Sequence, residues 1–303
     1  MDLSAFSVNP TYIAPSAWWQ HVPIAHWLIF ALRPERVVEL GSHFGVSFFA
    51  FCEAAEAFSP NTFIYAIDTW GGDEHAGFYN EDVYSKVAGH WEDHHRVRSR
   101  LVRSTFDLAA EHFEDKSIDI LHIDGLHTYA AVRHDYETWL PKLKDEAIVL
   151  FHDINVRERE FGVWKLWEEI KDNNKTYEVL NGHGLGILVF GEEMASKLVE
   201  LPASLRTLQA KGELLEKLAQ MSLNLASGLA AVEHARAETM QARAEAEQAR
   251  ADAEQARAEA KQARAEAEQV AHSLRGMQES RIWRLTRPVR LIADYGKRFT
   301  HNQ

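Results

Sequence analysis

The sequence is poor in cysteine, and Cys52 is the single one among 303 residues. One thiol cannot form an intramolecular disulfide, so packing must hold the fold together, and the chain suits a reducing compartment. Cys52 lies in an apolar helical run and is expected to be a small buried core residue.

Long apolar runs are absent too. No stretch of about 18 consecutive apolar residues occurs, which excludes a membrane-spanning helix. The N-terminal region has no charged segment followed by an uninterrupted apolar one, because polar residues and prolines interrupt it: Pro15, Gln20, His21 and Pro23. The sequence therefore predicts no signal peptide and a cytoplasmic location.

Positive charge is scarce over most of the chain. The formal net charge of −12 argues against general nucleic-acid binding. Residues 281–298 are the exception, with five Arg and one Lys against one Asp, interleaved with apolar residues every three or four positions. This pattern suits an anionic membrane surface and predicts a peripheral position at its inner face. Docking onto a partner protein or the chain's own helix is the alternative.

Short apolar runs alternate with helical patterns over the first 200 residues. The predicted strands are residues 36–40, 62–68, 99–103, 118–124, 147–151, 176–180 and 185–190. The predicted helices are residues 46–57, 81–91, 106–114, 129–140 and 163–171. The alternation predicts an α/β fold with a doubly wound, mostly parallel, seven-stranded Rossmann-like sheet. Only residues 181–184 separate the last two strands, which predicts an antiparallel hairpin.

The pattern changes to one long helix after residue 201. Glutamine recurs every seven residues, at Gln241, Gln248, Gln255, Gln262 and Gln269. A sustained heptad predicts a coiled coil and a homo-oligomer, although its alanine seam buries little area and a solvated single helix is the alternative. The predicted division is an α/β domain at 1–200, a heptad helix at 201–280 and a basic tail at 281–303.

A glycine turn follows the first predicted strand. The dinucleotide fingerprint needs glycines where His43 and Val46 stand, so NAD and FAD are disfavoured. The turn resembles motif I of class I S-adenosylmethionine methyltransferases, which implies a cofactor site at these positions: Glu39, Gly41, Ser42 and Gly45. Asp68 ends the second predicted strand, where a carboxylate can accept hydrogen bonds from both ribose hydroxyls.

Polar residues cluster after two later strands. Asp124 and His127 form the first cluster, and His152, Asp153 and Asn155 form the second. The carboxyl ends of parallel strands open onto one crevice, so these side chains are expected to meet beside the cofactor, with Asp124 bordering it. Because carboxylate and amide oxygens suit Mg²⁺, the predicted metal ligands are Asp124, Asp153 and Asn155.

The string Ile-Asp-Gly-Leu-His-Thr-Tyr at residues 123–129, with His-Asp at 152–153, resembles the macrocin O-methyltransferase and cephalosporin-hydroxylase-like family. Residues 15–19 and 66–73 resemble members associated with bacterial surface-sugar clusters, and the similarity covers about residues 12–192. The resemblance implies an O-methyltransferase (EC 2.1.1.-) whose Mg²⁺ is held by Asp124 and Asp153. Ile154 replaces a frequent third acidic ligand, which leaves His152, Asn155 or water for that place.

The expected reaction is methyl transfer from S-adenosylmethionine to a sugar hydroxyl in a surface polysaccharide or glycolipid. Mg²⁺ would acidify the hydroxyl, and a base would take its proton. His127 is the first candidate base and His152 the second, with Asp124 beside them, and a structural role for either histidine is the alternative. Two other functions stay open: a degenerate methyltransferase used as an assembly module, and a metal-dependent oxidoreductase.

Other residues carry simpler expectations. Three tryptophans are candidates for a substrate wall: Trp18, Trp19 and Trp70. Three histidines in a charged helix are expected to be solvated: His90, His94 and His95. The glycine-rich loop that contains His75 is long enough to act as a lid.

Overall fold

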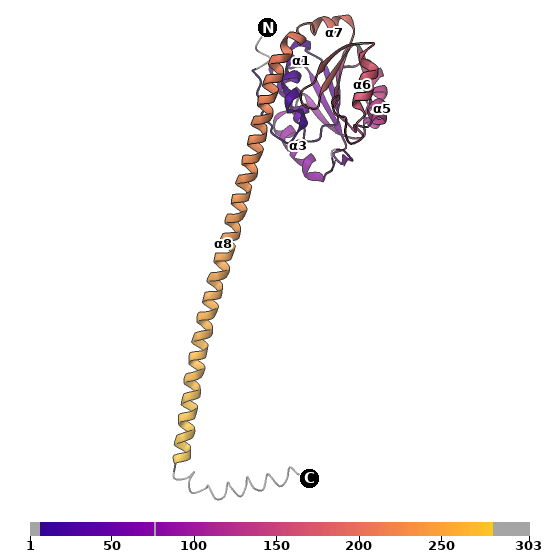
Figure 1. The fold of residues 1–303 in the computed structure, drawn as a ribbon. Helices are drawn as coiled ribbons and strands as arrows, with labels where there is room; N and C mark the ends of the chain where they lie inside the picture. Colours follow the sequence, from indigo (N-terminus) through magenta and orange to yellow (C-terminus); the bar gives the residue numbers. More distant parts are fainter. Residues whose placement is uncertain (1–6, 76, 281–303) are drawn as a thin grey trace, which may run out of the picture. The chain divides into compact units, whose positions relative to one another are not determined.

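The structure is a computed structural model that describes residues 7–75 and 77–280 (Figure 1). The predicted basic tail, residues 281–303, lies outside the described residues. The strands are β1 (Arg36–Leu40), β2 (Phe63–Asp68), β3 (Gly72–Asp73), β4 (Gly77–Phe78), β5 (Ser99–Arg103), β6 (Ile118–Ile123), β7 (Leu143–His152), β8 (Lys175–Val179) and β9 (Leu185–Phe190). The helices are η2 (Ala17–His21), α1 (Val22–Leu32), α2 (Val46–Phe58), α3 (Glu81–His94), α4 (Phe106–Ala110), α5 (Tyr129–Trp139), η3 (Leu140–Lys142), α6 (Val163–Lys171), α7 (Glu192–Lys197) and α8 (Leu201–Glu279).

A seven-stranded sheet organises the first part of the chain, in the order β5-β2-β1-β6-β7-β9-β8. The strands from β5 to β7 are parallel to their neighbours, whereas β9 runs antiparallel to both β7 and β8. The predicted mostly parallel sheet and its closing hairpin are therefore confirmed. The chain leaves β1 toward β2 and β5 and then returns to β6, so the direction of winding reverses between β1 and β6. Such a switch point opens a crevice at the carboxyl ends of the strands.

Both faces of the sheet are covered by helices. Successive side chains of a strand point to opposite faces. Val37 belongs to the core cluster that contains residues of α1 and α2, while Val38 belongs to the cluster that contains residues of α5 and α6. This double burial explains why the strands read as nearly continuous apolar runs.

Helix α1 is an element that the sequence does not predict. Nine of its eleven residues are buried, so it has no polar face from which a helical period could be recognised. It follows η2 directly, and both elements contribute to the core cluster that covers α2. Together they place Trp18 beside the carboxyl edge of the sheet.

The first turns of α8 pack against the α/β core. Leu201 and Leu208 are buried, and Gln20 Nε2 donates to Glu216 Oε2 at 2.8 Å. Gly212 lies against the backbone of Gln20, where a Cβ would collide. The first compact unit accordingly ends at Ser227. The predicted boundary at residue 200 lies before this packed part of the helix.

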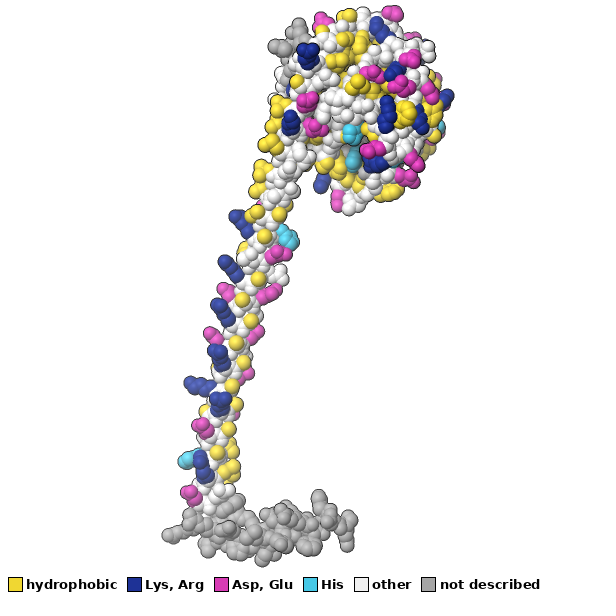
Figure 2. All heavy atoms as spheres, in the orientation of Figure 1, with side chains coloured by type: hydrophobic (Ala, Val, Ile, Leu, Met, Phe, Trp, Pro, Cys, Tyr) yellow, Lys and Arg dark blue, Asp and Glu magenta, His cyan; other side chains and the backbone are white. Residues whose placement is uncertain are grey.

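The second unit begins at Gly228, and its described part is helical and exposed along its whole length. Glutamines of the seven-residue repeat donate to carboxylates four positions later, as Gln241 does to Glu245 at 3.0 Å. Figure 2 shows acidic and basic side chains distributed along this helix. The predicted helix is confirmed here, and its self-association stays a prediction. Among the described residues, none of the helices combines the length and the apolar character needed to cross a bilayer.

Candidate active site

The glycine turn after β1 joins three strands at the carboxyl edge of the sheet. Gly41 N donates to the carbonyl of Ile67 at 2.9 Å, and Asp124 N donates to the carbonyl of Leu40 at 2.8 Å. Gly41 has a φ of +88°, and it lies so close to the Asp124 carbonyl that a Cβ would collide with it. Glycine alone combines this backbone conformation with this close approach.

Asp68 fixes the shape of the turn. Its Oδ2 accepts hydrogen bonds from the backbone N–H groups of Ser42 at 2.8 Å and His43 at 3.0 Å. Its Oδ1 accepts a third from the N–H of Trp70 at 2.7 Å. The predicted ribose acceptor therefore also organises the loop around it.

A cavity of about 250 Å³ opens over the turn. Its walls include Gly41, Ser42, Asp68 and Asp124, four of the predicted cofactor residues. These residues follow three neighbouring strands, β1, β2 and β6, so the cavity occupies the switch point of the sheet. Such a position is typical of a cofactor site in an open α/β sheet.

Glu39 and Gly45, the other two predicted cofactor residues, lie behind this wall. Glu39 is fully buried; its Oε1 accepts from the Ser42 hydroxyl and its Oε2 lies 2.9 Å from Nδ1 of His122. Gly45 precedes α2 at a φ of +82°, where a Cβ would press on the Phe49 ring at 2.9 Å. Both residues shape the turn from behind and do not form the surface of the cavity.

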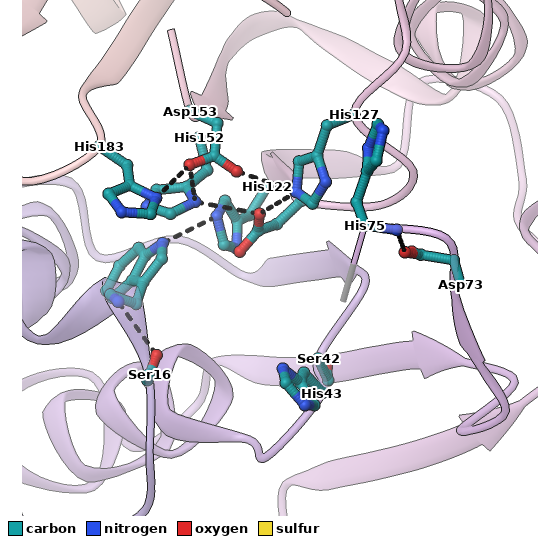
Figure 3. A network of polar contacts seen from close by, with 12 residues as sticks. Ser16, Ser42, His43, Asp73, His75, His122, His127, His152, Asp153 and His183 are labelled. Atoms are coloured by element: carbon teal, nitrogen blue, oxygen red, sulfur yellow. Dashed lines mark hydrogen bonds and ion pairs between the residues drawn. The ribbon is translucent and has the colours of Figure 1, made fainter. Parts of the chain in front are cut away.

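Two aspartates and two histidines form a compact cluster at the ends of β6 and β7 (Figure 3). Asp124 Oδ1 lies 3.0 Å from His152 Nδ1 and 3.4 Å from His127 Nε2. Asp153 Oδ2 lies 2.9 Å from His127 Nε2, and Asp153 Oδ1 lies 2.9 Å from Nδ1 of His183. The structure thus joins the predicted residues of the two strand ends and adds His183 from the β8–β9 turn.

Burial and charge pairing act in opposite directions within the cluster. Burial alone would lower the pKa of His127, but its bonds to Asp124 and Asp153 outweigh burial and raise the pKa to about 9. Against burial, the same carboxylates raise the pKa of His152 well above its usual value. Burial would raise the pKa of both aspartates, yet the two imidazoles hold it below the usual range. Carboxylates and imidazolium groups therefore neutralise one another at neutral pH.

The donor set fits a divalent cation. Ligand atoms of Asp124, His152 and Asp153 all lie within 4.8 Å of one another. Two carboxylates suit Mg²⁺, and the imidazole extends the choice to softer metals. Asn155, a predicted ligand, is exposed, and its Nδ2 donates to the carbonyl of Leu180 at 3.3 Å. His152, one of the alternatives for the third place, lies beside the carboxylates instead.

A second, smaller cavity of about 150 Å³ adjoins the cluster. It shares Trp18, Asp124 and His127 with the first cavity, so the two spaces meet at these side chains. On one side, the Phe161 ring stacks on His127 with centroids 4.6 Å apart and on His75 at the same distance. Donor atoms of the cluster and a flat aromatic side thus border one space.

The predicted substrate wall consists of three tryptophans: Trp18, Trp19 and Trp70. All three are almost fully buried, and Trp18 alone lines the two cavities. Its contact with a substrate stays a prediction.

The expectation that three histidines are solvated holds for His94 only. His90 is half-buried, with its ring centroid 4.7 Å from that of Phe49. His95, which follows α3, is buried, and its Nδ1 lies 2.7 Å from Glu56 Oε1.

Two site residues are not predicted by the sequence, His122 and His183, and His75 is predicted only as part of a lid loop. His122 had a recognisable signal, because a histidine inside an otherwise apolar strand must find a buried partner. His75 and His183 lie in loops, where no periodicity fixes the direction of a side chain.

These features define an α/β domain with a ligand cavity at its switch point and an acid–imidazole cluster beside it. Residues 38–154 match the model of a family described as "Methyltransferase domain". That segment contains the glycine turn, Asp68, Asp124 and Asp153. An uncharacterized protein of Sinorhizobium fredii, y4gI, is 47% identical over 198 residues, 65% of this chain. The chain spans 22% of the length of that relative.

Solved structures similar to this chain include two methyltransferases. The O-methyltransferase TomG of Streptomyces achromogenes, in complex with SAM, is 14% identical with a TM-score of 0.43, over 63% of this chain and 87% of TomG. The SAH-bound methyltransferase PaMTH1 of Podospora anserina is 14% identical with a TM-score of 0.43, over 63% of this chain and 94% of PaMTH1.

Proposed function

We propose that the protein is an S-adenosylmethionine-dependent O-methyltransferase that uses a divalent cation, Mg²⁺ in the first place, and acts on a sugar hydroxyl of a bacterial surface polysaccharide or glycolipid. The observation that carries the proposal is the meeting of two cavities at Asp124 and His127. A donor over the glycine turn and an acceptor beside the cluster would be neighbours, which is what group transfer requires.

The first cavity suits the methyl donor. Gly41 lets the backbones of β1 and of the segment after β6 approach each other beneath the space, and Asp68 borders the space with a carboxylate. Each carboxylate oxygen has two lone pairs, and backbone N–H groups occupy both on Oδ2 and one on Oδ1. Asp68 can therefore accept one ribose hydroxyl, at Oδ1, while it retains its backbone hydrogen bonds. The match of residues 38–154 to a methyltransferase family supports this assignment.

The cluster suits activation of a hydroxyl. When bound, a divalent cation supplies a Lewis acid for the acceptor and a positive charge that opposes protonation of the nearby imidazoles. Asp124, Asp153 and His152 would hold it. A neutral His127 that donates Nε2–H to Asp153 keeps its Nδ1 lone pair, and Nδ1 is a buried atom without a hydrogen-bond partner among the described residues.

In the proposed step, the acceptor oxygen bonds to the methyl carbon as the carbon–sulfur bond breaks, and the hydroxyl proton passes to His127. The products are a methyl ether and S-adenosylhomocysteine. The aromatic side formed by Phe161 and His75 supports a sugar acceptor, whose C–H faces can pack on rings.

Calorimetric titration with S-adenosylmethionine, with and without Mg²⁺, tests the donor assignment. Binding is expected for the wild type, and its absence under both conditions would refute the proposed function. Radiolabelled methyl transfer to a panel of sugars and surface glycans then tests the acceptor class.

Asp153→Ala tests the role of the cation. Transfer should fall at least about a hundredfold and Mg²⁺ binding should be lost, because this carboxylate contacts His127 and borders the cation site. Asp145→Ala removes an exposed carboxylate from the same strand and should have no effect. Transfer that survives both EDTA and Asp153→Ala would refute the metal-assisted route and leave the methyltransferase class intact.

A second candidate function is assembly, and the uncovered helix of residues 228–279 favours it. Apolar side chains there are exposed, with Leu229 at 58%, Val232 at 50% and Met240 at 73%. We propose that these helices associate into a homo-oligomer through their heptads. Sedimentation over a range of concentrations tests this, and a monomer at all concentrations would refute it. Vesicle flotation with and without residues 281–303 tests the predicted membrane contact.

A further inference from the structure

A row of buried hydrogen bonds runs behind the two cavities. The Ser42 hydroxyl donates to Glu39, Glu39 Oε2 lies 2.9 Å from His122 Nδ1, and the Trp18 indole N–H donates to His122 Nε2 at 3.1 Å. Glu39 and His122 are fully buried, and Trp18 is 2% exposed. The row thus connects Ser42 of the glycine turn to Trp18 of η2. Its Trp18–His122 bond joins residues that lie 104 positions apart in the sequence.

The directions of these bonds fix the state of His122. Because an indole nitrogen can only donate, His122 Nε2 must carry a lone pair. The proton of the neutral ring then sits on Nδ1 and is donated to Glu39. Glu39 accepts from two donors and gives none, so it serves as the ionised acceptor that orders the row.

Trp18 is the end of this row that faces ligand space. It lines the first cavity together with Ser42 and lines the second together with His152 and Asp153. A rotation of its ring would change both spaces at once. Ring packing against His21 and Phe51 restricts that rotation, and the N–H adds one directional bond, to His122.

We infer that Glu39 and His122 are positioning residues, which hold Trp18 as the shared wall of the two cavities and tie it to the glycine turn through Ser42. Neither residue lines a cavity, so each acts through Trp18 or Ser42. The identity of the ligands, a methyl donor and its acceptor, rests on the proposed function; the positioning itself does not.

A double-mutant cycle on the full chain tests this coupling, with S-adenosylhomocysteine as the probe. Trp18→Phe removes the indole donor, and His122→Asn removes its acceptor while its amide can still donate to Glu39. Each single variant should bind the probe about tenfold more weakly, which is the effect of one lost hydrogen bond. The double variant should be no weaker than either single one, because the same bond is lost once.

Helix α1 supplies matched controls, since His26 is fully buried and Trp27 is 5% exposed. His26→Asn and Trp27→Phe make the same chemical changes in the same core and should alter the affinity less than twofold. Equal weakening by the control and test variants would reduce His122 to a general core residue and overturn the inference. Additive losses, or single variants that bind like the wild type, would overturn it as well.

Hydrogen exchange of the Trp18 indole proton, followed by NMR, tests the row without any ligand. Exchange should be slow in the wild type and at least tenfold faster in His122→Asn, whereas His26→Asn should leave it unchanged. An exchange rate of the indole proton that does not change in His122→Asn would refute the positioning. A wild type that shows the protected proton but binds no S-adenosylhomocysteine would refute the proposed function alone.

Discussion

Two carboxylate–histidine pairs show how differently the two units of this chain use the same side chains. His122 and Glu39 lie 2.9 Å apart in the α/β unit, and both are fully buried. His234 and Glu238 lie 3.5 Å apart on the second unit, with 76% and 70% of their side chains exposed. Water competes for the second pair and screens it, whereas each member of the first pair has only protein partners. Burial, and not residue type, therefore decides how much such a pair contributes to the stability of the fold.

Removal of the carboxylate should show the largest difference in stability between the two pairs. Glu39→Ala is expected to cost about 2–6 kcal/mol of unfolding free energy, because it leaves two buried donors, the neutral His122 ring and the Ser42 hydroxyl, without an acceptor. Glu238→Ala should leave stability unchanged. Urea unfolding of both variants measures the difference, and similar losses would contradict the contrast drawn here.

Replacement of glycine by alanine should destabilise the α/β unit and stabilise the second unit. Gly41→Ala places a Cβ against the Asp124 carbonyl at a positive φ, so a loss of more than about 2 kcal/mol is expected in urea unfolding. Gly228 lies in a helix where an added Cβ would meet no neighbouring atom within 4 Å, and Gly228→Ala should stabilise that helix by about 0.5–1 kcal/mol. Thermal melts followed at 222 nm report the helix, and a destabilised Gly228→Ala would show that its surface is covered.

Buried ionisable groups should also make the α/β unit sensitive to pH. Burial, together with the charge of Asp107, raises the pKa of Asp135 to about 7, above the value of about 3.9 expected in the unfolded chain. The folded state then binds the extra proton, so stability is full below about pH 4 and declines as pH rises toward 7. Asp135→Asn should therefore stabilise the protein by about 1–3 kcal/mol at pH 8 and by little at pH 4.

Urea unfolding at the two pH values measures this, with the exposed Asp252→Asn on the second unit as the control. A gain for Asp135→Asn that is equal at both pH values would show that its charge is not the cause.

The smallest effect on the α/β unit is expected from deletion of residues 228–303. Every described side chain of that segment is exposed, so its loss should leave the unfolding midpoint of the first unit unchanged. The same deletion should convert the proposed oligomer to a monomer in sedimentation. A lowered midpoint would mean that the second unit contributes packing to the first.

The fold was predictable where apolar runs ended at clear signals. Four elements, β1, β5, β9 and α6, begin and end where the sequence predicts. In contrast, β7 starts at Leu143, four residues earlier than expected, because residues 144–146 are polar and this part of the strand pairs with β6 but not with β9. Helix α1 could not be predicted from period, since its burial on nearly all sides removes the polar face.

The site was predictable where strand ends converge, and not beyond. Asp124 and Asp153 follow neighbouring parallel strands, so topology alone brings them together with His127 and His152. The contact between Trp18 and His122 and that between His183 and Asp153 depend on how separate segments pack. No local spacing contains that information. Asn155 has a side chain that suits Mg²⁺, but its amide donates to the carbonyl of Leu180 in the β8–β9 connection.

Asp68 has a consequence for the speed of ligand capture. Its carboxylate already holds the N–H groups of Ser42, His43 and Trp70, so the loop has its shape in the ligand-free chain. The entropy of ordering that loop is lost during folding and does not recur at each encounter. Association at this cavity should therefore follow the simple kinetics of a preformed receptor, with one phase whose rate rises linearly with ligand concentration.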